Sequence, residues 1–385
     1  MNILIISPRY PYKDNMEFVF VKKIVDEWAK AGHHCIVITS FSKTAYKRGT
    51  IEYKPELYRE EITTDVTVDV YNPRFISTGL NIAGVSLNSW AAAHVIEKKI
   101  KSLKIKFDLF YCHFFASAIL VYRYASQHQI PLFVATGESN VKLLNKPYPG
   151  FRWDAFRKYI KGVVAVSTKN KDDATKFGMI NPQKCRVFPN GTDISFFKPY
   201  NRMDCRMSLG LPQDAFIVSC VGFFCERKGQ DRLLKAVRKI GNNNIKLLFL
   251  GRAAKFDTFQ LEGDEILFKG SVENKDLPQY LCASDVFCLP TRAEGCCNAI
   301  IEALACGLPV ISSNRPFNRD VLDDTNSILI DPDNIGEISE ALRMLRENPL
   351  KRKELSEGAV VRSHSLSINQ RAKDILLFMG NNVYL

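Results

Sequence analysis

The feature that most constrains the fold is a regular alternation of short apolar runs with longer amphipathic segments. In the first half the apolar runs lie at 2–7, 35–40, 109–112, 131–136 and 162–167. In the second half they lie at 216–224, 246–251, 265–270, 285–290, 309–313 and 327–331. The helices expected in the second half lie around 230–240, 276–283, 297–306 and 335–347. Apolar strands alternating with helices are typical of a parallel sheet covered on both faces. Two such series predict an α/β protein of two doubly wound, Rossmann-like domains that face a cleft.

The two series meet near 195–205, where the sequence FFKPYNRMDC brings a proline and several polar residues. We therefore expect an N-terminal domain over 1–195 and a C-terminal domain over 196–365. A last helix near 366–385 is expected to pack back on the first domain. The segment 41–75 begins strongly polar, and we interpret it as an excursion or a flexible loop.

Basic residues are concentrated in the first half of the chain. Residues 1–190 hold 28 Lys and Arg against 16 Asp and Glu, which accounts for the whole net charge of +12. A basic domain can meet nucleic acid, an anionic membrane or an anionic substrate. The sequence shows no recognisable nucleic-acid-binding module, and its lysines lack the aromatic interleaving of single-strand binders. We therefore expect no nucleic-acid partner.

The N-terminal residues and the cysteines favour a cytoplasmic protein. The start, MNILIISP, lacks the basic region and long apolar region of a signal peptide. No stretch approaches the roughly 20 apolar residues that span a bilayer. The 11 cysteines form no C-x-x-C pair, and most lie in apolar runs. This favours buried reduced thiols over a metal or redox site.

The segment AEGCCNAIIEALACGLPVISS places two carboxylates around a predicted helix start. Gly295 disfavours one helix through both of them, so we place Glu294 in a loop, Asn298 near the helix start and Glu302 about one turn inside. Free N–H groups at a helix start, together with two carboxylates, suit a polyhydroxyl ligand that carries phosphate. Helix capping with solvated surface charge is the alternative interpretation.

The segment VGFFCERKGQDRLLKA predicts a strand that ends at Gly222 and a helix that starts near Gly229. Arg227 and Lys228 lie in the turn between them, at the carboxyl edge of the predicted parallel sheet, where anions commonly bind. They could neutralise a diphosphate leaving group. The alternative is a pair of solvated surface cations.

These segments together resemble the GT-B glycosyltransferases of retaining family 4, the glycosyl transferases group 1. The stretch VAVSTKNKDDATKFGMINPQKCRVFPNGTDISFFKP resembles the domain-closing run of that family. VGFFCERKGQDRLLKAV resembles its phosphate-binding turn, and LPQYLCASDVFCLPTRAEGCCNAIIEALACGLPVI resembles its donor-site signature. The match is densest from 160 to 345. It implies that the first domain takes the acceptor and the second binds the nucleotide-sugar donor.

The resemblance implies roles for individual residues. Glu302 is expected to bind the ribose, Glu294 the hydroxyls of the transferred sugar, and Arg227 with Lys228 the diphosphate. His113, in DLFYCHFF, matches the frequent active-site histidine of the family. The alternative is a structural histidine at a strand end whose hydrogen bonds are made within the protein. Gly270, Ser271 and Val272 are expected to face the base. The other expected donor-site residues are Gly222, Gly295, Cys296, Cys297 and Asn298.

The sequence departs from the family pattern at three places. The turn after the first strand, which is glycine-rich in the family, is DNMEF at 14–18 and has no glycine. Gly222-Phe223 stands where the family often has Gly-Arg, so Arg227 is expected to replace that arginine. On the acceptor side, Gly137 and Glu138 belong to Thr136-Gly137-Glu138-Ser139, where the family commonly has His-Gly-x-Asp. We expect no metal or other cofactor, because the D-x-D at Asp331–Asp333 lies outside the donor motif.

These features predict a retaining, hexosyltransferase-type enzyme. It would move a sugar from a nucleotide-sugar, taken to be a UDP-sugar, to a hydroxyl of a glycan or lipid-linked acceptor. The setting would be cell-surface polysaccharide synthesis, such as lipopolysaccharide or capsule. A nucleotide-sugar epimerase on the same fold, or a non-catalytic nucleotide- or sugar-binding protein, are the alternatives.

The charge of the first domain also predicts reversible, peripheral contact with the anionic inner face of the cytoplasmic membrane. The candidate cations are Lys98, Lys99, Lys101, Lys104 and Lys106. The same segment carries the apolar residues Val95, Ile96, Ile100, Leu103 and Ile105. The alternative is that these apolar residues belong to the core and the lysines are merely solvated.

Overall fold

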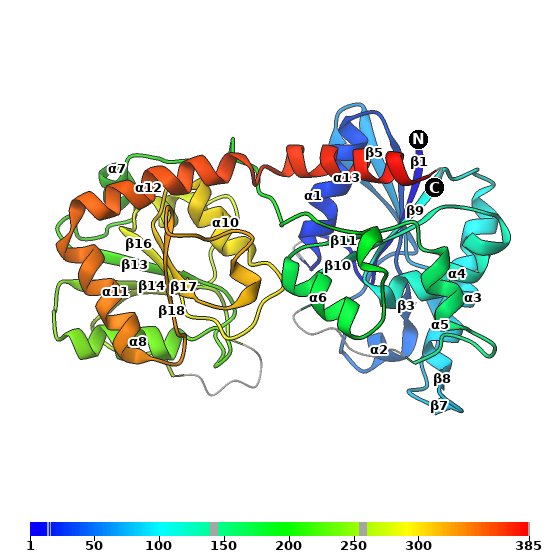
Figure 1. Cartoon of the computed structure of the whole chain (residues 1–385), viewed down its shortest axis with the longest axis horizontal. Coiled ribbons are helices and arrows are strands. Elements are labelled where there is room, and N and C mark those ends of the chain that lie inside the picture. The colour runs from blue at the N-terminus through cyan, green and yellow to red at the C-terminus, as the bar shows by residue number, and fades with distance from the viewer. Residues whose placement is uncertain (14, 16, 139–144, 254–259, 384–385) are drawn as a thin grey trace. The chain divides into compact units, whose positions relative to one another are not determined.

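The structure is a computed structural model, and it describes residues 1–383 except 14, 16, 139–144 and 254–259. The chain forms two compact units, Met1–Phe188 with Arg371–Leu385 (unit 1) and Pro189–Gln370 (unit 2) (Figure 1). The division falls at 188/189 rather than at the expected 195/196. The Asn190 side-chain amide donates to the Cys296 carbonyl over 3.1 Å, and the Thr192 amide donates to the Leu366 carbonyl over 2.9 Å, so the segment 189–192 contacts the rest of unit 2.

Unit 1 is built on a large, mostly parallel sheet. Its strands are β1 (Asn2–Ile6), β2 (His34–Ile38), β4 (Leu57–Thr63), β5 (Val66–Tyr71), β9 (Leu109–His113), β10 (Leu132–Thr136), β11 (Gly162–Ala165) and β12 (Cys185–Val187). They lie in the order β12-β11-β10-β9-β1-β2-β5-β4. Only the β4–β5 pair is antiparallel. The order reverses between β1 and β9, so the segments that leave these two strands diverge at one sheet edge.

Helices and short strand pairs complete unit 1. The helices are α1 (Val19–Lys30), α2 (Lys43–Lys47), α3 (Leu87–Leu103), α4 (Phe115–Gln127), α5 (Trp153–Tyr159), α6 (Thr168–Lys176) and α13 (Ile368–Val383), with a 3-10 turn at Pro182–Lys184. The short pairs are β3 (Phe41–Ser42) with β6 (Arg74–Phe75) and β7 (Asn81–Ile82) with β8 (Val85–Ser86). The indole of buried Trp28 on α1 donates to the Ala372 carbonyl on α13 over 2.9 Å.

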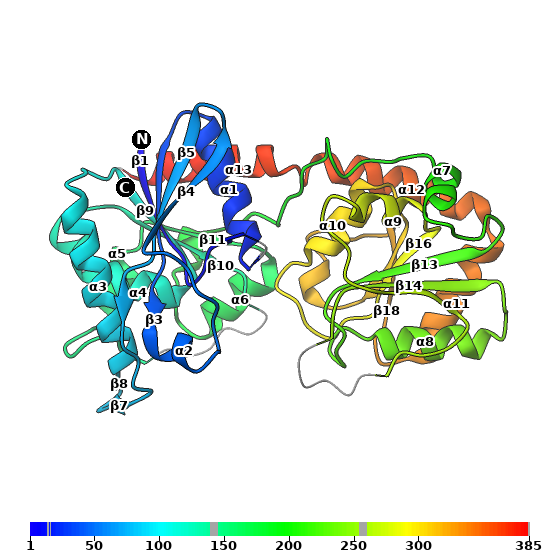
Figure 2. The ribbon, with the colours of Figure 1, turned by 180° about the vertical axis from the view of Figure 1, so that it is seen from behind.

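Unit 2 is a doubly wound domain with a fully parallel sheet. Its strands are β13 (Phe216–Val221), β14 (Ile245–Leu250), β15 (Ile266–Gly270), β16 (Val286–Leu289), β17 (Val310–Ser313) and β18 (Ser327–Ile330), in the order β15-β14-β13-β16-β17-β18. Its helices are α7 (Arg202–Ser208), α8 (Gln230–Ile240), α9 (Leu277–Cys282), α10 (Asn298–Ala305), α11 (Ile335–Glu347) and α12 (Pro349–His364), with a 3-10 turn at Pro316–Asn318. Helices α8 and α11 lie on one side of the sheet, and α10 and α12 lie on the other (Figures 1 and 2). The fold class expected from the alternating pattern is confirmed.

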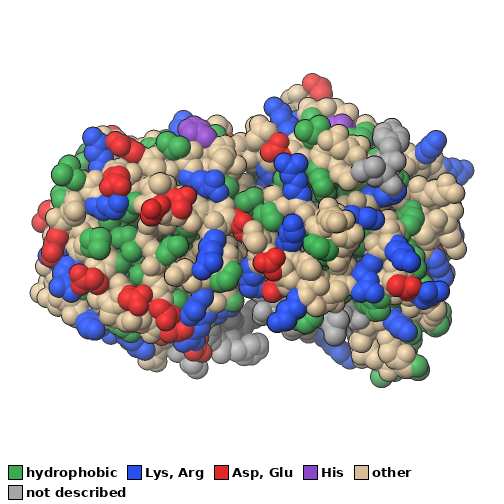
Figure 3. Space-filling model, in the orientation of Figure 1, with side chains coloured by type: hydrophobic (Ala, Val, Ile, Leu, Met, Phe, Trp, Pro, Cys, Tyr) green, Lys and Arg blue, Asp and Glu red, His purple; other side chains and the backbone are tan. Residues whose placement is uncertain are grey.

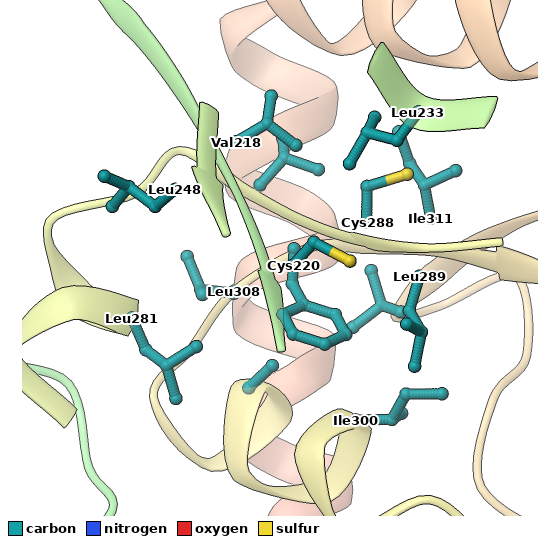
Figure 4. Packing of buried hydrophobic residues seen from close by; sticks show 14 of the residues in the cluster. Val218, Cys220, Leu233, Leu248, Leu281, Cys288, Leu289, Ile300, Leu308 and Ile311 are labelled. Carbon is teal, nitrogen blue, oxygen red and sulfur yellow. The ribbon is translucent and has the colours of Figure 1, made fainter. Parts of the chain in front are cut away.

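The core of unit 2 fills the space between the sheet and both helix layers. Figure 4 shows Leu233 of α8 and Ile300 of α10 on opposite sides of the strands that carry Cys220 and Cys288. All four side chains are buried. All 11 cysteines lie in the described part of the chain, none forms a disulfide, and nine of them are buried. The cysteines therefore act mainly as small apolar core residues.

The interpretation of 41–75 as an excursion or flexible loop is wrong. This segment forms β3, α2, β4, β5 and β6, and β5 pairs in parallel with β2. The strand β4 has the sequence LYREEIT, and its residues alternate between exposed and half-buried. A charged edge strand with one solvated face carries too little apolar signal to be predicted from composition.

Most apolar side chains of the segment 95–105 belong to the core of unit 1. Ile96 and Ile100 of α3 are buried in the core of unit 1, and Leu103 and Ile105 pack against that core. The candidate lysines are exposed except for Lys99, which lies over the Tyr71 ring. For these four apolar residues the alternative interpretation, core apolar residues with solvated lysines, is correct, whereas Val95 is half-buried and outside that core. Among the described residues, no helix is both long and apolar enough to cross a bilayer.

A buried carboxylate fixes the start of unit 2 to its sheet. Asp285 accepts from Arg206 over 2.7 Å, from Arg202 over 2.6 Å, and from the Ile217 amide over 2.8 Å. Arg206 is buried and also donates to the carbonyls of Ala283 and Gln213. Because each buried charge has an opposite charge and further hydrogen bonds, its desolvation is offset.

We predict that Asp285→Ala lowers the free energy of unfolding by about 3–5 kcal/mol, because it leaves Arg206 buried without its carboxylate. The matched control is Arg202→Ala. Its side chain is about half exposed, so its loss should cost about 1 kcal/mol or less. Urea unfolding followed by circular dichroism measures both. Equal midpoints for Asp285→Ala and wild type would contradict the assignment.

Candidate functional site

The candidate site of unit 2 lies where its strand order reverses. Strands β14 and β16 flank β13, so the segments after β13 and β16 leave the carboxyl edge of the sheet in different directions. Arg227 and Lys228 lie after β13 and just before α8. Glu294 lies after β16 and before α10, in a loop as expected. The sheet therefore brings together groups that are 67 positions apart in sequence.

One carboxylate oxygen holds both cations. Glu294 Oε1 lies 2.7 Å from Arg227 Nη1 and 2.8 Å from Lys228 Nζ. The buried Thr291 hydroxyl donates to the same oxygen over 2.9 Å. Burial opposes the charge on Lys228, whereas the Glu294 carboxylate attracts the ammonium and accepts its hydrogen bond, and the pKa of Lys228 lies above its ordinary value. The ammonium therefore stays charged at neutral pH.

Backbone contacts hold the two loops against each other. The Arg227 guanidinium also donates to the Ala293 carbonyl, and the Arg292 amide donates to the Arg227 carbonyl over 2.9 Å. Lys228 Nζ lies 3.9 Å from Cys297 Sγ. Burial raises the pKa of the Cys297 thiol, so this sulfur is neutral. The protein's own contacts thus hold the two cations and their carboxylate together.

The helix α10 starts at Asn298, at the place expected from the sequence, and Glu302 lies about one turn inside. Glu302 is 8% exposed. Cys297, the residue directly before the helix start at Asn298, has an extended backbone. Within the described part of the chain, the buried Asn298 Oδ1 has no hydrogen-bond partner. A buried acceptor beside a helix start is an arrangement that a bound ligand could complete.

Two glycines keep this edge of the sheet free of side chains. A Cβ atom on Gly251, which follows β14, would lie 2.0 Å from the Gly222 carbonyl oxygen. A Cβ on Gly222 would lie 3.2 Å from Lys228 Cε, and both glycines have positive φ. The Gly251 amide donates to the Gly270 carbonyl over 2.8 Å, which sets the end of β15 beside them. Gly270, Ser271 and Val272 therefore line the same edge.

In unit 1 the expected residues follow β9 and β10. His113 ends β9, is 3% exposed, and packs against the rings of Phe20, Tyr111 and Phe114. Burial and the nearby Arg371 lower the pKa of His113 to about 3, so its imidazole is neutral. Its buried Nε2 has no hydrogen-bond partner among the described residues.

Glu138 lies just beyond β10, beside Gly137. Its Oε2 accepts from the Thr136 hydroxyl over 2.6 Å and from the Gly137 amide over 3.0 Å. Burial raises the pKa of this carboxyl. Ser139, the last residue of the acceptor-side pattern, lies outside the described residues.

Sequence reasoning missed several residues of these arrangements. Thr291, Gly251 and Arg371 were not singled out, although Thr291 and Gly251 each follow an apolar strand, which was the available signal. Arg252, one residue after Gly251, lies over the Phe223 ring with a distance of 5.2 Å to the ring centre. The Arg252 guanidinium therefore lies beside Phe223, the position at which the family often has an arginine.

The D-x-D motif is paired with arginines. Asp331 lies 3.0 Å from Arg315, and Asp333 lies 2.7 Å from Arg292. In the part of the chain that is described, no three His, Cys, Asp or Glu residues are grouped so that they could hold a metal ion.

Comparisons with known proteins bear on both units. The family "Glycosyltransferase Family 4" matches residues 18–196, and "Glycosyl transferases group 1" matches residues 202–361. The putative teichuronic acid biosynthesis glycosyltransferase TuaC of Bacillus subtilis is 26% identical over 93% of this chain and 92% of its own length. An Escherichia coli UDP-Gal:alpha-D-GlcNAc-diphosphoundecaprenol alpha-1,3-galactosyltransferase is 28% identical over 54% of this chain and 56% of its own length.

Solved structures share the fold over nearly the whole chain. Sucrose-phosphate synthase from Thermosynechococcus elongatus has a TM-score of 0.75 at 18% identity, covering 99% of both chains. HepE of Anabaena in complex with UDP has a TM-score of 0.74 at 17% identity, covering 99% of this chain and all of that one. The sheet order, the two family matches and these structures agree: the chain is a glycosyltransferase of the group 1 family with the GT-B fold.

Proposed function

We propose that this protein is a retaining hexosyltransferase that moves a sugar from a UDP-sugar to a hydroxyl of a glycan or lipid-linked acceptor. The observation that carries the proposal is the pair of cations, Arg227 and Lys228, held by Glu294 at the strand-order reversal of unit 2. Two fixed positive charges at a sheet edge suit a diphosphate. The resemblance to a retaining family supports the stereochemistry, and HepE, a structural neighbour, was solved with UDP.

In the proposed reaction the bond between the anomeric carbon and the diphosphate breaks, and the acceptor oxygen bonds to that carbon on the same face. Negative charge grows on the leaving diphosphate, where Arg227 and Lys228 stabilise it. The leaving phosphate accepts the proton of the acceptor hydroxyl, so no side-chain base is needed. Among the described residues, the contacts of Glu294 all go to Oε1, which leaves Oε2 for a sugar hydroxyl.

The remaining donor contacts follow from α10 and the ends of the neighbouring strands. Glu302 binds the ribose hydroxyls, and the α10 amides with Asn298 face the phosphates and the sugar. Gly270, Ser271 and Val272 approach the base. Gly295, Cys296 and Cys297 shape the sugar pocket. His113 serves as a neutral hydrogen-bonding group rather than as an acid, because burial keeps its pKa near 3.

The proposed setting is the synthesis of a cell-surface polysaccharide such as capsule or lipopolysaccharide. The name of the teichuronic acid relative supports a polysaccharide product, and that of the Escherichia coli relative supports a lipid-linked acceptor. Gly137 and Glu138 are proposed to line the acceptor side. The basic excess of residues 1–190 favours a cytoplasmic enzyme held peripherally at an anionic membrane.

The first test measures binding of the nucleotide. UDP at about 100 times its Kd should stabilise the protein by about 2.7 kcal/mol, and GDP or ADP at the same concentration should do so less. Glu302→Ala should weaken the UDP effect without unfolding the protein, because it removes the ribose contact. Thermal shift measures both. Equal UDP stabilisation in mutant and wild type would remove Glu302 from the site.

Lys228→Ala should lower turnover by roughly 100–1000-fold, because one preorganised charge on the leaving group is lost. The matched control is Lys235→Ala in the following helix α8, whose side chain is 66% exposed and pairs with Asp231. This control should keep normal turnover. Release of UDP from a UDP-sugar in the presence of acceptor is the measurement. A folded Lys228→Ala enzyme with near-normal turnover would contradict the mechanism.

We also expect catalysis to continue in EDTA, because the two cations and the helix amides carry the charge stabilisation that a metal would otherwise supply. The measurement compares turnover before and after chelation, and after magnesium or manganese is added back. Complete loss in chelator, restored by either metal, would contradict the diphosphate contact proposed for Arg227 and Lys228.

A further inference from the structure

Large apolar side chains are exposed at one end of unit 1. Among the described residues, seven of the seventeen exposed large hydrophobic residues lie between positions 46 and 90. Six of them form what we call the tip patch: Tyr46, Tyr53, Ile76, Leu80, Ile82 and Trp90. Figure 3 shows hydrophobic side chains at the lower right tip, where Figure 1 places β7 and β8. Monomeric proteins rarely expose such a cluster without a use for it.

Hydrogen bonds hold the segments of the tip patch together. The Ser42 and Ser77 hydroxyls lie 2.6 Å apart, and they join the start of α2 to the segment after β6. The Leu87 amide at the start of α3 donates to the Leu80 carbonyl over 3.1 Å. The Tyr46 and Tyr53 rings lie 5.9 Å apart. The patch is therefore a built surface and not a set of separate loops.

A hollow of about 500 Å³ opens within this surface. Its apolar wall consists of Phe75, Ile76, Trp90 and Val95. Lys43 and Arg74 also line the hollow. Trp90 is 49% exposed, so its indole can reach both the apolar and the aqueous side of an interface. Apolar side chains with aromatic residues and cations at the rim are the composition found at the boundary between lipid head groups and acyl chains.

The charges around the tip patch are mainly positive. Residues 43–56 and 72–96, which carry the patch, contain five Lys and Arg residues (Lys43, Lys47, Arg48, Lys54 and Arg74) against two acidic ones, Glu52 and Glu56. Glu56 lies 3.5 Å from Arg74. Glu97, the next acidic residue, is buried and paired with Arg123. A second copy of this chain would bring like charges together, whereas anionic lipid offers the opposite charge.

We infer that the tip patch is the surface through which unit 1 contacts an anionic lipid bilayer, with Leu80, Ile82 and Trp90 entering the interface and Lys43 and Lys47 meeting the head groups. This deepens the membrane part of the proposed function. It replaces the lysine segment 98–106 as the contact surface. It does not depend on the chemistry of sugar transfer.

The test is flotation of the full chain with vesicles of phosphatidylcholine and phosphatidylglycerol, compared with phosphatidylcholine alone. The protein should float with the anionic vesicles and be released by high salt, since screening shortens the Debye length below its physiological value of about 8 Å. Leu80→Ser with Ile82→Ser should lower binding about tenfold. Each of Lys43→Glu and Lys47→Glu should lower it about fivefold or more.

Matched controls lie elsewhere on unit 1. Phe177→Ser with Leu377→Ser removes two exposed apolar side chains outside the patch, and Lys98→Glu with Lys101→Glu reverses two exposed lysines of α3. Both controls should bind the vesicles nearly as wild type does. If the α3 control abolishes binding while the patch variants keep it, the tip patch is not the contact surface.

Tryptophan fluorescence gives a second measurement. Of the three tryptophans, Trp28 is fully buried and Trp153 is half-buried, so a blue shift on vesicle binding should come from Trp90 and vanish in Trp90→Phe. Absence of flotation, or a patch-dependent dimer in sedimentation experiments, would overturn the inference. Either result would leave the nucleotide and turnover tests of the proposed function unaffected.

Discussion

The arrangement of the candidate site depends on backbone pairing in parallel sheets whose strand order reverses once. Parallel strands all present their carboxyl ends at one edge, and the reversal separates the loops of β13 and β16 there. The loops then bring Arg227, Lys228 and Glu294 within ion-pair distance. Lys228 is nearly buried, and it can remain charged because the carboxylate offsets its desolvation.

Most of the fold was predictable because buried parallel strands carry a strong signal in sequence. The runs that became β13 to β18 are apolar almost throughout, and both faces of the sheet are covered, so the prediction of a second doubly wound domain was confirmed. The start of α10 was also predictable, since Gly295 breaks any continuous helix through Glu294 and Glu302. The placement of Glu294 in a loop and of Glu302 in a helix followed from this local rule.

The remainder could not be predicted because it depends on long-range contacts or weak patterns. The charged edge strand β4 looks like a loop in sequence, and the core position of Ile96 and Ile100 is set by packing rather than by their neighbours. The bond between Asn190 and Cys296, next to the unit boundary, joins residues 106 positions apart. The tip patch emerges only when α2, β6 and α3 are placed side by side.

Unit 1 is discontinuous in sequence, and the hydrogen bond from Trp28 to the Ala372 carbonyl joins its two parts. Ile375 and Met379 of α13 are also fully buried there, and Phe378 lies where any side chain on Gly162 would clash with it. During synthesis on the ribosome, the first sheet is made long before the helix that completes its core. Unit 2 is encoded between these two parts of unit 1. The Trp28 indole therefore finds its acceptor only after all of unit 2 has been synthesised.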